Sequence, residues 1–139
     1  MTVYTGSCHC RSIRLKLDTA RPLADIPVRL GSDPLSRRHA LRLATDPDAS
    51  FEIRGDLRAV QRYAFAQKLV DFVVCRVCGT CVGVMAKVGD KTIGAPSVAC
   101  MDEWEGFAKP SARIVLQSDA IEEKRRQLLE VLMPTRLDV

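Results

Sequence analysis

The chain has 139 residues, 47% of them hydrophobic and 27% charged, which is the length and composition of one globular domain with its own core. A net charge of +4 is well short of the basic footprint of a nucleic-acid-binding protein, so we expect no nucleic-acid partner. No apolar run approaches the roughly 18 residues of a membrane span, and residues 1–7 lack the pattern of a secretory signal. We expect a single domain over residues 1–139, located in the cytoplasm, without membrane contact.

Most of the chain has the pattern of short strands joined by turns. Residues 12–17 alternate, with Ile13, Leu15 and Leu17 on one face, which predicts a half-buried strand. Further strands are predicted, in chain order, over residues 28–30, 40–44, 51–54, 60–66, 69–74, 82–88 and 91–100. Turn residues separate them, including residues 31–34 and a hairpin turn at 89–91. The predicted fold class is mainly β.

The C-terminal extension, residues 118–139, changes character. Ser118 is a good N-cap residue, acidic residues follow it, and basic residues come next, as the helix dipole favours. An apolar stripe at helical spacing comprises Ile121, Leu128, Leu129 and Leu132. The pattern predicts one helix over about 118–133, ended by Pro134.

Two cysteine motifs carry the chemistry. Cys75 and Cys78 are three positions apart and are followed by a glycine, which is typical of a metal-binding knuckle. A closed zinc site needs four ligands, and the other dense cysteine cluster is Cys8 and Cys10. In a reducing compartment clustered cysteines indicate metal ligands before disulfides, so we predict one structural zinc ion held by all four. The alternative is that they are small buried apolar residues.

Other cysteines and histidines leave further alternatives open. Cys78 and Cys81 have the spacing of a redox dithiol, but a strand pattern follows, whereas redox pairs usually lie at a helix N-terminus. Cys81 is either a buried neighbour or a ligand in place of Cys75, and Cys100 is predicted to be a core residue on a strand. His9, between two predicted ligands, is expected to point away from the metal.

Several segments resemble the glutathione-dependent formaldehyde-activating enzyme family, which includes centromere protein V. The most specific are residues 6–10, Gly-Ser-Cys-His-Cys, and residues 74–79, Val-Cys-Arg-Val-Cys-Gly. Weaker matches are Arg37-Arg38 and residues 51–55, 63–65 and 97–102, so that the similarity covers about 3–104. The resemblance implies a β-tent (Mss-four-like) fold of small, curled antiparallel sheets. It also implies a structural zinc ion at the positions of Cys8, Cys10, Cys75 and Cys78.

The family carries a second zinc ion that serves its carbon–sulfur lyase reaction, of the S-(hydroxymethyl)glutathione synthase type. The matching cysteine positions are Leu30, Ser32 and Leu35 in this chain, and no cysteine occurs between Arg11 and Val74. Ligand chemistry for a second zinc ion is therefore missing from this segment. Arg11 stands where the family usually has glycine.

Two hypotheses of function follow. The first is a single-zinc protein that binds a small thiol such as glutathione, or a partner protein. In this case Leu30, Leu35 and Leu41 form either an apolar groove or ordinary core.

The second hypothesis is an enzyme of the lyase class acting on glutathione adducts without the second zinc. It would use Ser32, Asp33 and His39 for catalysis, with Arg37 or Arg38 holding a carboxylate. A weaker prediction is a homodimer formed through the apolar stripe of the C-terminal helix.

Overall fold

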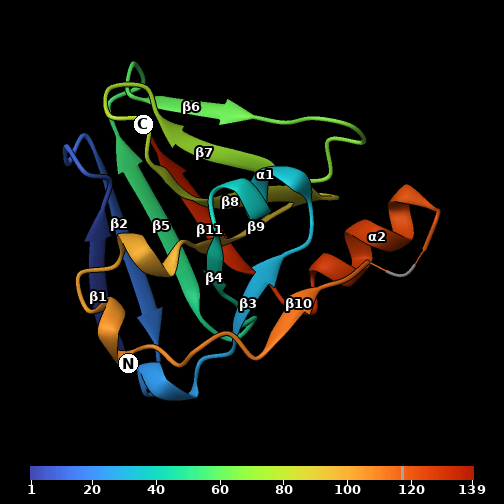
Figure 1. The fold of residues 1–139 in the computed structure, drawn as a ribbon, viewed down its shortest axis with the longest axis horizontal. Coiled ribbons are helices and arrows are strands. Elements are labelled where there is room, and N and C mark those ends of the chain that lie inside the picture. Colours follow the sequence, from blue (N-terminus) through green and yellow to red (C-terminus); the bar gives the residue numbers. More distant parts are fainter. Residues whose placement is uncertain (117) are drawn as a thin grey trace.

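Strands are the main regular structure of the computed structural model, which describes residues 1–116 and 118–139 (Figure 1). The strands are β1 (Thr2–Ser7), β2 (Ile13–Thr19), β3 (Val28–Gly31), β4 (Arg42–Ala44), β5 (Ser50–Gly55), β6 (Val60–Tyr63), β7 (Asp71–Cys75), β8 (Cys81–Val88), β9 (Lys91–Pro96), β10 (Ala112–Ile114) and β11 (Met133–Asp138). The helices are α1 (Pro34–Arg38) and α2 (Ile121–Leu128), with single 3-10 turns η1 (Leu23–Asp25), η2 (Val98–Cys100) and η3 (Trp104–Gly106). The predicted fold class, mainly β with a C-terminal helix, is confirmed.

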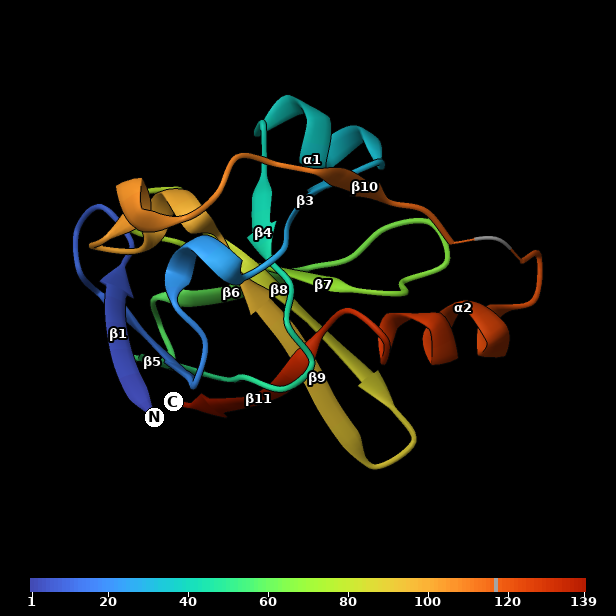
Figure 2. The same cartoon turned by 90° about the horizontal axis from the view of Figure 1, so that it is seen from below.

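The strands form two sheets. The larger has eight strands in the order β1-β2-β5-β11-β9-β8-β7-β6, and the smaller has three in the order β10-β3-β4. Neighbours in the larger sheet are antiparallel except β11 and β5, which run parallel. The smaller sheet and α1 lie on one side of the larger sheet, and α2 lies at the end remote from β1 (Figure 2).

β11 joins the two parts of the larger sheet. Thr135 to Asp138 pair with β5, whereas Met133 and Pro134 pair with β9. Proline cannot donate a backbone hydrogen bond and is rare inside a sheet. It is tolerated here because Pro134 lies at the end of the short ladder with β9, just before the ladder with β5 begins.

The burial of the strands follows from their residue patterns. Every second residue of β2 is buried, including Ile13, Leu15 and Leu17, as its alternation predicts. The first six residues of β8 are all buried, because this strand is covered on both faces. One apolar cluster lies around β2 and β5 and a second around β8, β9 and α2.

Some elements differ from those predicted. α2 spans Ile121–Leu128 instead of about 118–133, and its N-cap is Ala120, although Ser118 Oγ accepts a hydrogen bond from Ala120 N. Pro134, expected to end the helix, lies inside β11. The pattern also missed β1, β10 and α1, and Cys100 lies on the 3-10 turn η2 instead of a strand.

Candidate metal centre

The turn between β1 and β2 presents the first pair of cysteines. Cys8 N donates a hydrogen bond to Ile13 O at 3.0 Å, and Arg11 N donates to Cys8 O at 3.3 Å, so the turn is closed by its own backbone. Arg11 has a φ of 67°, in the left-handed region that favours glycine. This backbone conformation lets the chain reverse within a few residues, so that Cys8 and Cys10 face the same side.

The connection between β7 and β8 presents the second pair. Gly79 N donates to Cys75 O at 2.8 Å and Cys75 N donates to Thr80 O at 2.9 Å, which forms a tight knuckle. Gly79 has a φ of +80°, and a Cβ atom added there would meet nothing within 4 Å. The position therefore needs glycine for its backbone conformation and not for space.

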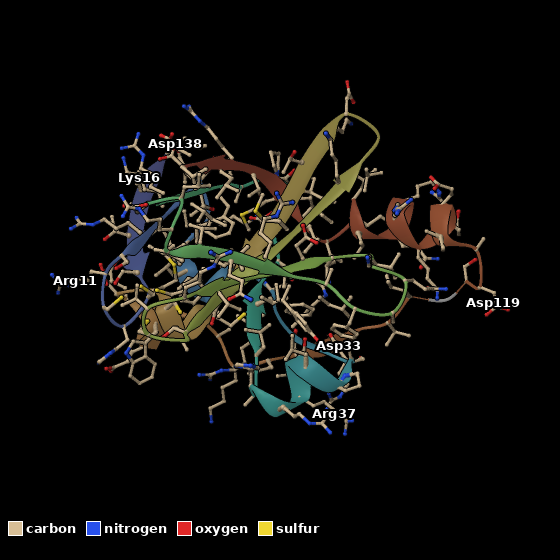
Figure 3. All side chains as sticks on the ribbon, turned by 90° about the horizontal axis from the view of Figure 1, so that it is seen from above. Arg11, Lys16, Asp33, Arg37, Asp119 and Asp138 are labelled. Carbon is tan, nitrogen blue, oxygen red and sulfur yellow. The ribbon has the colours of Figure 1, made fainter. Side chains whose placement is uncertain are left out.

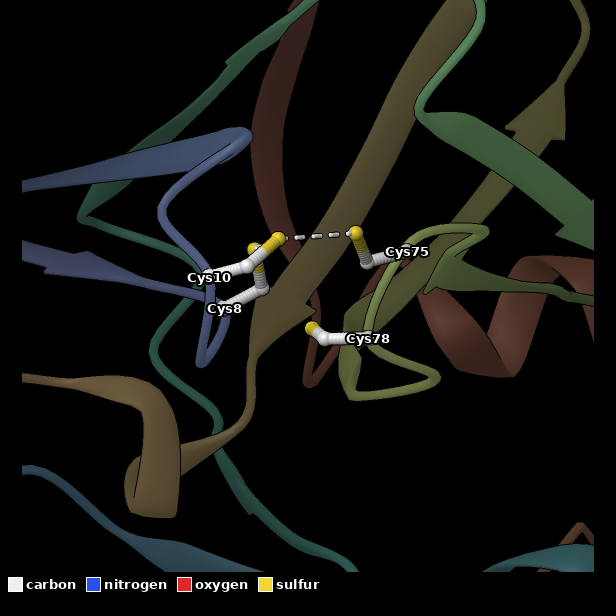
Figure 4. Close-up of side chains that lie close together, drawn as sticks. All are labelled: Cys8, Cys10, Cys75 and Cys78. Carbon is white, nitrogen blue, oxygen red and sulfur yellow. Dashed lines mark hydrogen bonds between the residues drawn. The ribbon is translucent and has the colours of Figure 1, made fainter.

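The four sulfur atoms face one another across these two turns (Figure 4). The Sγ atoms of Cys8, Cys10, Cys75 and Cys78 all lie within 4.8 Å of one another. Cys10 Sγ is 3.7 Å from Cys8 Sγ and 3.6 Å from Cys75 Sγ. A tetrahedral ion with metal–sulfur bonds of about 2.3 Å would space its sulfurs about 3.8 Å apart. These distances match that spacing and are far longer than a disulfide bond of about 2.05 Å.

Hydrogen bonds prepare two of the thiols to ionise. Ser12 Oγ lies 3.2 Å from Cys10 Sγ, and Thr80 Oγ1 lies 3.3 Å from Cys78 Sγ. The Ser12 hydroxyl lowers the pKa of Cys10, and the Thr80 hydroxyl lowers the pKa of Cys78 to about 5, helped by backbone N–H groups. Both sulfurs are thus suited to be thiolates, the form that binds metals.

The buried thiol of Cys8 has the opposite tendency. Burial raises the pKa of Cys8 to about 11, although Ile13 N donates a hydrogen bond to its sulfur at 3.3 Å. A bound cation would offset this cost of burial by supplying the positive charge that the thiolate lacks. The environment of Cys8 is therefore one that a metal ion would complete.

The donor set limits the chemistry that this cluster can support. Four thiolates fill a tetrahedral coordination shell and leave no position for a substrate. Cys8 and Cys75 are 2% and 0% exposed, so two of the four donors are sealed in the core. A cluster of this kind can hold a metal ion that stabilises the fold.

The speculative catalytic residues Ser32, Asp33 and His39 are engaged elsewhere or exposed. Ser32 Oγ donates to Ile114 O at 2.9 Å, which ties β3 to β10. Asp33 caps α1: its carboxylate accepts from Ser36 N at 2.9 Å and from Ser36 Oγ at 2.6 Å. His39 is the exposed C-cap residue of the same helix. Among the described residues, the four cysteines are the one group of metal-ligating side chains within bonding reach of a common ion.

The remaining predicted residues are placed as follows. Leu41 is buried, and half-buried Leu35 packs on the same apolar cluster, so both belong to the core. Cys81 begins β8 and is buried, which raises its pKa to about 11, and no helix follows it. Cys100 donates to Cys81 O at 3.5 Å. His9 is exposed, as expected.

The sequence also carried a signal for the two hydroxyls beside the sulfurs. Ser12 follows Cys10 by two positions, and Thr80 follows Cys78 by two positions. A hydroxyl two residues after a metal-binding cysteine can form a hydrogen bond with the sulfur of that cysteine within the same tight turn. The repeated spacing could have identified both residues as hydrogen-bond partners of the ligands.

No protein-family model and no curated protein matches this chain. Its fold is similar to the crystal structure of a Rhodobacter sphaeroides protein that was a target of the Northeast Structural Genomics effort. The TM-score is 0.58 at 18% sequence identity, over 79% of this chain and 99% of the other. The likeness concerns the fold.

In the described part of the chain, no helix has the length and apolar character needed to cross a membrane.

Proposed function

We propose that Cys8, Cys10, Cys75 and Cys78 hold one zinc ion whose role is structural. The observation that carries the proposal is the mutual closeness of the four sulfurs, all within 4.8 Å of one another and two pairs at 3.6 and 3.7 Å, close to the spacing around a tetrahedral ion. All-thiolate tetrahedral sites select zinc or iron–sulfur chemistry, and a single ion fits a cluster of four mutually close sulfurs.

The ion would connect segments that are far apart in the chain. Cys10 and Cys75 are 65 positions apart and come from opposite parts of the larger sheet. The four sulfurs are brought together only in the folded chain. The free energy of zinc binding therefore adds directly to the free energy of folding. The protein would then depend on zinc for stability and not for a reaction.

The metal content tests this proposal. Protein purified under reducing conditions should contain about one zinc ion per chain, and Cys75→Ser should remove it. Cys100→Ala is the matched control, because Cys100 lies outside the cluster. A content of two zinc ions, of none, or of iron and sulfide in place of zinc would refute the proposal.

We also propose that the chain is a distant member of the formaldehyde-activating family, on the cysteine motifs and the mainly β fold together. The lyase reaction implied by the resemblance is disfavoured here, because Ser32 and Asp33 already make the structural hydrogen bonds described above. Turnover of formaldehyde with glutathione, assayed with and without added zinc, decides the question. Turnover that Ser32→Ala or His39→Ala abolishes would establish the enzyme hypothesis instead.

A further inference from the structure

A cavity of about 590 Å³ lies between the smaller sheet, the β7–β8 pair and α2. Its apolar wall includes the buried side chains of Leu43, Phe72, Val84 and Leu132. Phe65, from the loop after β6, lies in the same wall and stacks on Phe72, with ring centroids 5.8 Å apart. Its volume falls within the range of small-molecule sites, about 300–1,000 Å³.

The space is open to solvent on one side, since Ser32 and Gln67 in its lining are exposed. Water therefore occupies it when no ligand is bound. An apolar wall offers this water few hydrogen bonds, so replacing it with an apolar molecule is favourable.

The polar end of the cavity is rich in acceptors. Ser32 Oγ donates to Ile114 O, and Ser36 Oγ donates to Asp33, so both hydroxyl protons are already used. The carboxylate of half-buried Asp33 accepts two hydrogen bonds from Ser36 and keeps further lone pairs. In the described residues, no basic side chain forms an ion pair with Asp33. Figure 3 shows Asp33 at the start of α1 and Arg37 farther along the helix.

A lysine that contacts the cavity lining is already engaged. Lys124 Nζ donates to Gln67 Oε1 at 2.8 Å, and Gln67 lines the cavity. This leaves Asp33 as the charged group that lines the cavity itself. A ligand that places a cation or a strong donor at Asp33 and apolar atoms against Phe65 and Phe72 would satisfy both surfaces.

We propose that this cavity binds a small apolar amine, with its ammonium group at Asp33 and its apolar body among the buried side chains. The site is separate from the cysteine cluster, since none of the four cysteines lines the cavity. Binding of the amine therefore does not depend on which metal the cysteine cluster holds.

Three probes with the same ten-carbon chain and different polar groups test the proposal: decylamine and decanoate, each below its micelle-forming concentration, and 1-decanol below its solubility limit. Binding to the metal-loaded protein is measured by calorimetry and located by methyl chemical shifts of Leu43, Val84 and Leu132. We expect decylamine to bind most tightly and decanoate most weakly. The Kd of 1-decanol should be about tenfold higher than that of decylamine, because the alcohol lacks the charge-assisted hydrogen bond to Asp33.

Two variants separate the head from the body. Asp33→Asn keeps the cap of α1, because asparagine caps helices as well as aspartate does. It should weaken decylamine about tenfold and leave 1-decanol unchanged. Val70→Trp fills the cavity and should abolish binding of both. Val88→Trp is its control, since Val88 is also half-buried but lies outside the cavity.

The result that overturns the proposal is binding of decanoate as tight as that of decylamine, or methyl shifts confined to residues outside the cavity. Absence of binding at millimolar decylamine overturns it equally. Thermal unfolding of Val70→Trp shows whether this variant folds, and Asp33→Asn decides the matter if it does not.

Discussion

Removal of the metal from the cysteine cluster should cost this domain a large part of its stability. An ion held by Cys10 and Cys75 cross-links residues that are 65 positions apart. Closing a loop of this length lowers the entropy of the unfolded chain by an amount worth about 4 kcal/mol at 25 °C, before any bonding energy is counted. Domains of this size have about 5–15 kcal/mol in total, so the loss is roughly a quarter to four fifths of the whole.

Urea unfolding of the zinc-loaded and chelator-treated protein, in reducing buffer, measures this loss. The midpoint should fall by an amount equivalent to at least about 4 kcal/mol, and the melting temperature by at least roughly 10 °C. Cys75→Ser should be unstable with or without chelator, whereas Cys100→Ala should keep the full response. A chelator effect below about 1 kcal/mol would refute the cross-link argument.

Four further outcomes are expected. Gly79→Ala and Gly89→Ala should each lower the free energy of unfolding in urea by about 1 kcal/mol, because both positions have positive φ and open space around a Cβ. Only Gly79→Ala should also weaken zinc binding in a chelator competition. Equal effects of the two variants on zinc binding would contradict this reasoning. Arg11→Gly should stabilise the protein by about 0.5–1 kcal/mol, since relief of the left-handed backbone exceeds the added freedom of the unfolded chain; a loss of stability would show that the arginine side chain contributes. Because the pKa of Cys8 is about 11 without metal, zinc must displace at least this one proton, so zinc affinity should rise at least about tenfold per pH unit between pH 6 and 8. A flat profile would argue against ligation by Cys8. Deletion of residues 133–139 should leave a chain without dispersed NMR signals, because it removes the strand between β5 and β9; a folded monomer would disprove that role.

The cysteine cluster was accessible to sequence reasoning because the information is local. A tight turn around Gly79 orients two sulfurs, a second turn orients Cys8 and Cys10, and metal chemistry asks for four. The strands next to these turns were accessible for a similar reason, since Ile13 to Thr19 alternates and the first six residues of β8 carry no charged or polar side chain other than the thiol of Cys81.

The C-terminal strand could not be found in this way. The apolar stripe that predicted a long helix includes Leu129 and Leu132, but α2 ends at Leu128. Met133, completely buried, begins β11. Pairing of this segment with β5 and β9 outweighs its local helical preference, and such pairing between distant segments leaves no periodic mark in the sequence. Pro134 reinforced the wrong interpretation, because proline in a strand is rare.

Helix α1 shows a different failure, since its signals were present. Asp33 followed by Pro34 is an N-cap followed by the residue favoured at the first helical position. The same dipeptide is also common in turns, and a five-residue helix is too short for a hydrophobic period to separate the two. Because α1 was missed, Asp33 was interpreted as a candidate catalytic residue, whereas its carboxylate caps this helix.

The proposed metal centre and β11 would each connect the two parts of the larger sheet, at different places. The larger sheet consists of β1, β2 and β5 on one side and β9, β8, β7 and β6 on the other, with β11 between them. β11 joins the two parts at the middle through backbone hydrogen bonds. The cysteines join them at the β1–β2 turn and the β7–β8 knuckle, where no strand pairing is available. Because both turns depend on residues in the left-handed region, Arg11 and Gly79, a bound ion would stabilise the part of the sheet that the backbone ladder does not reach.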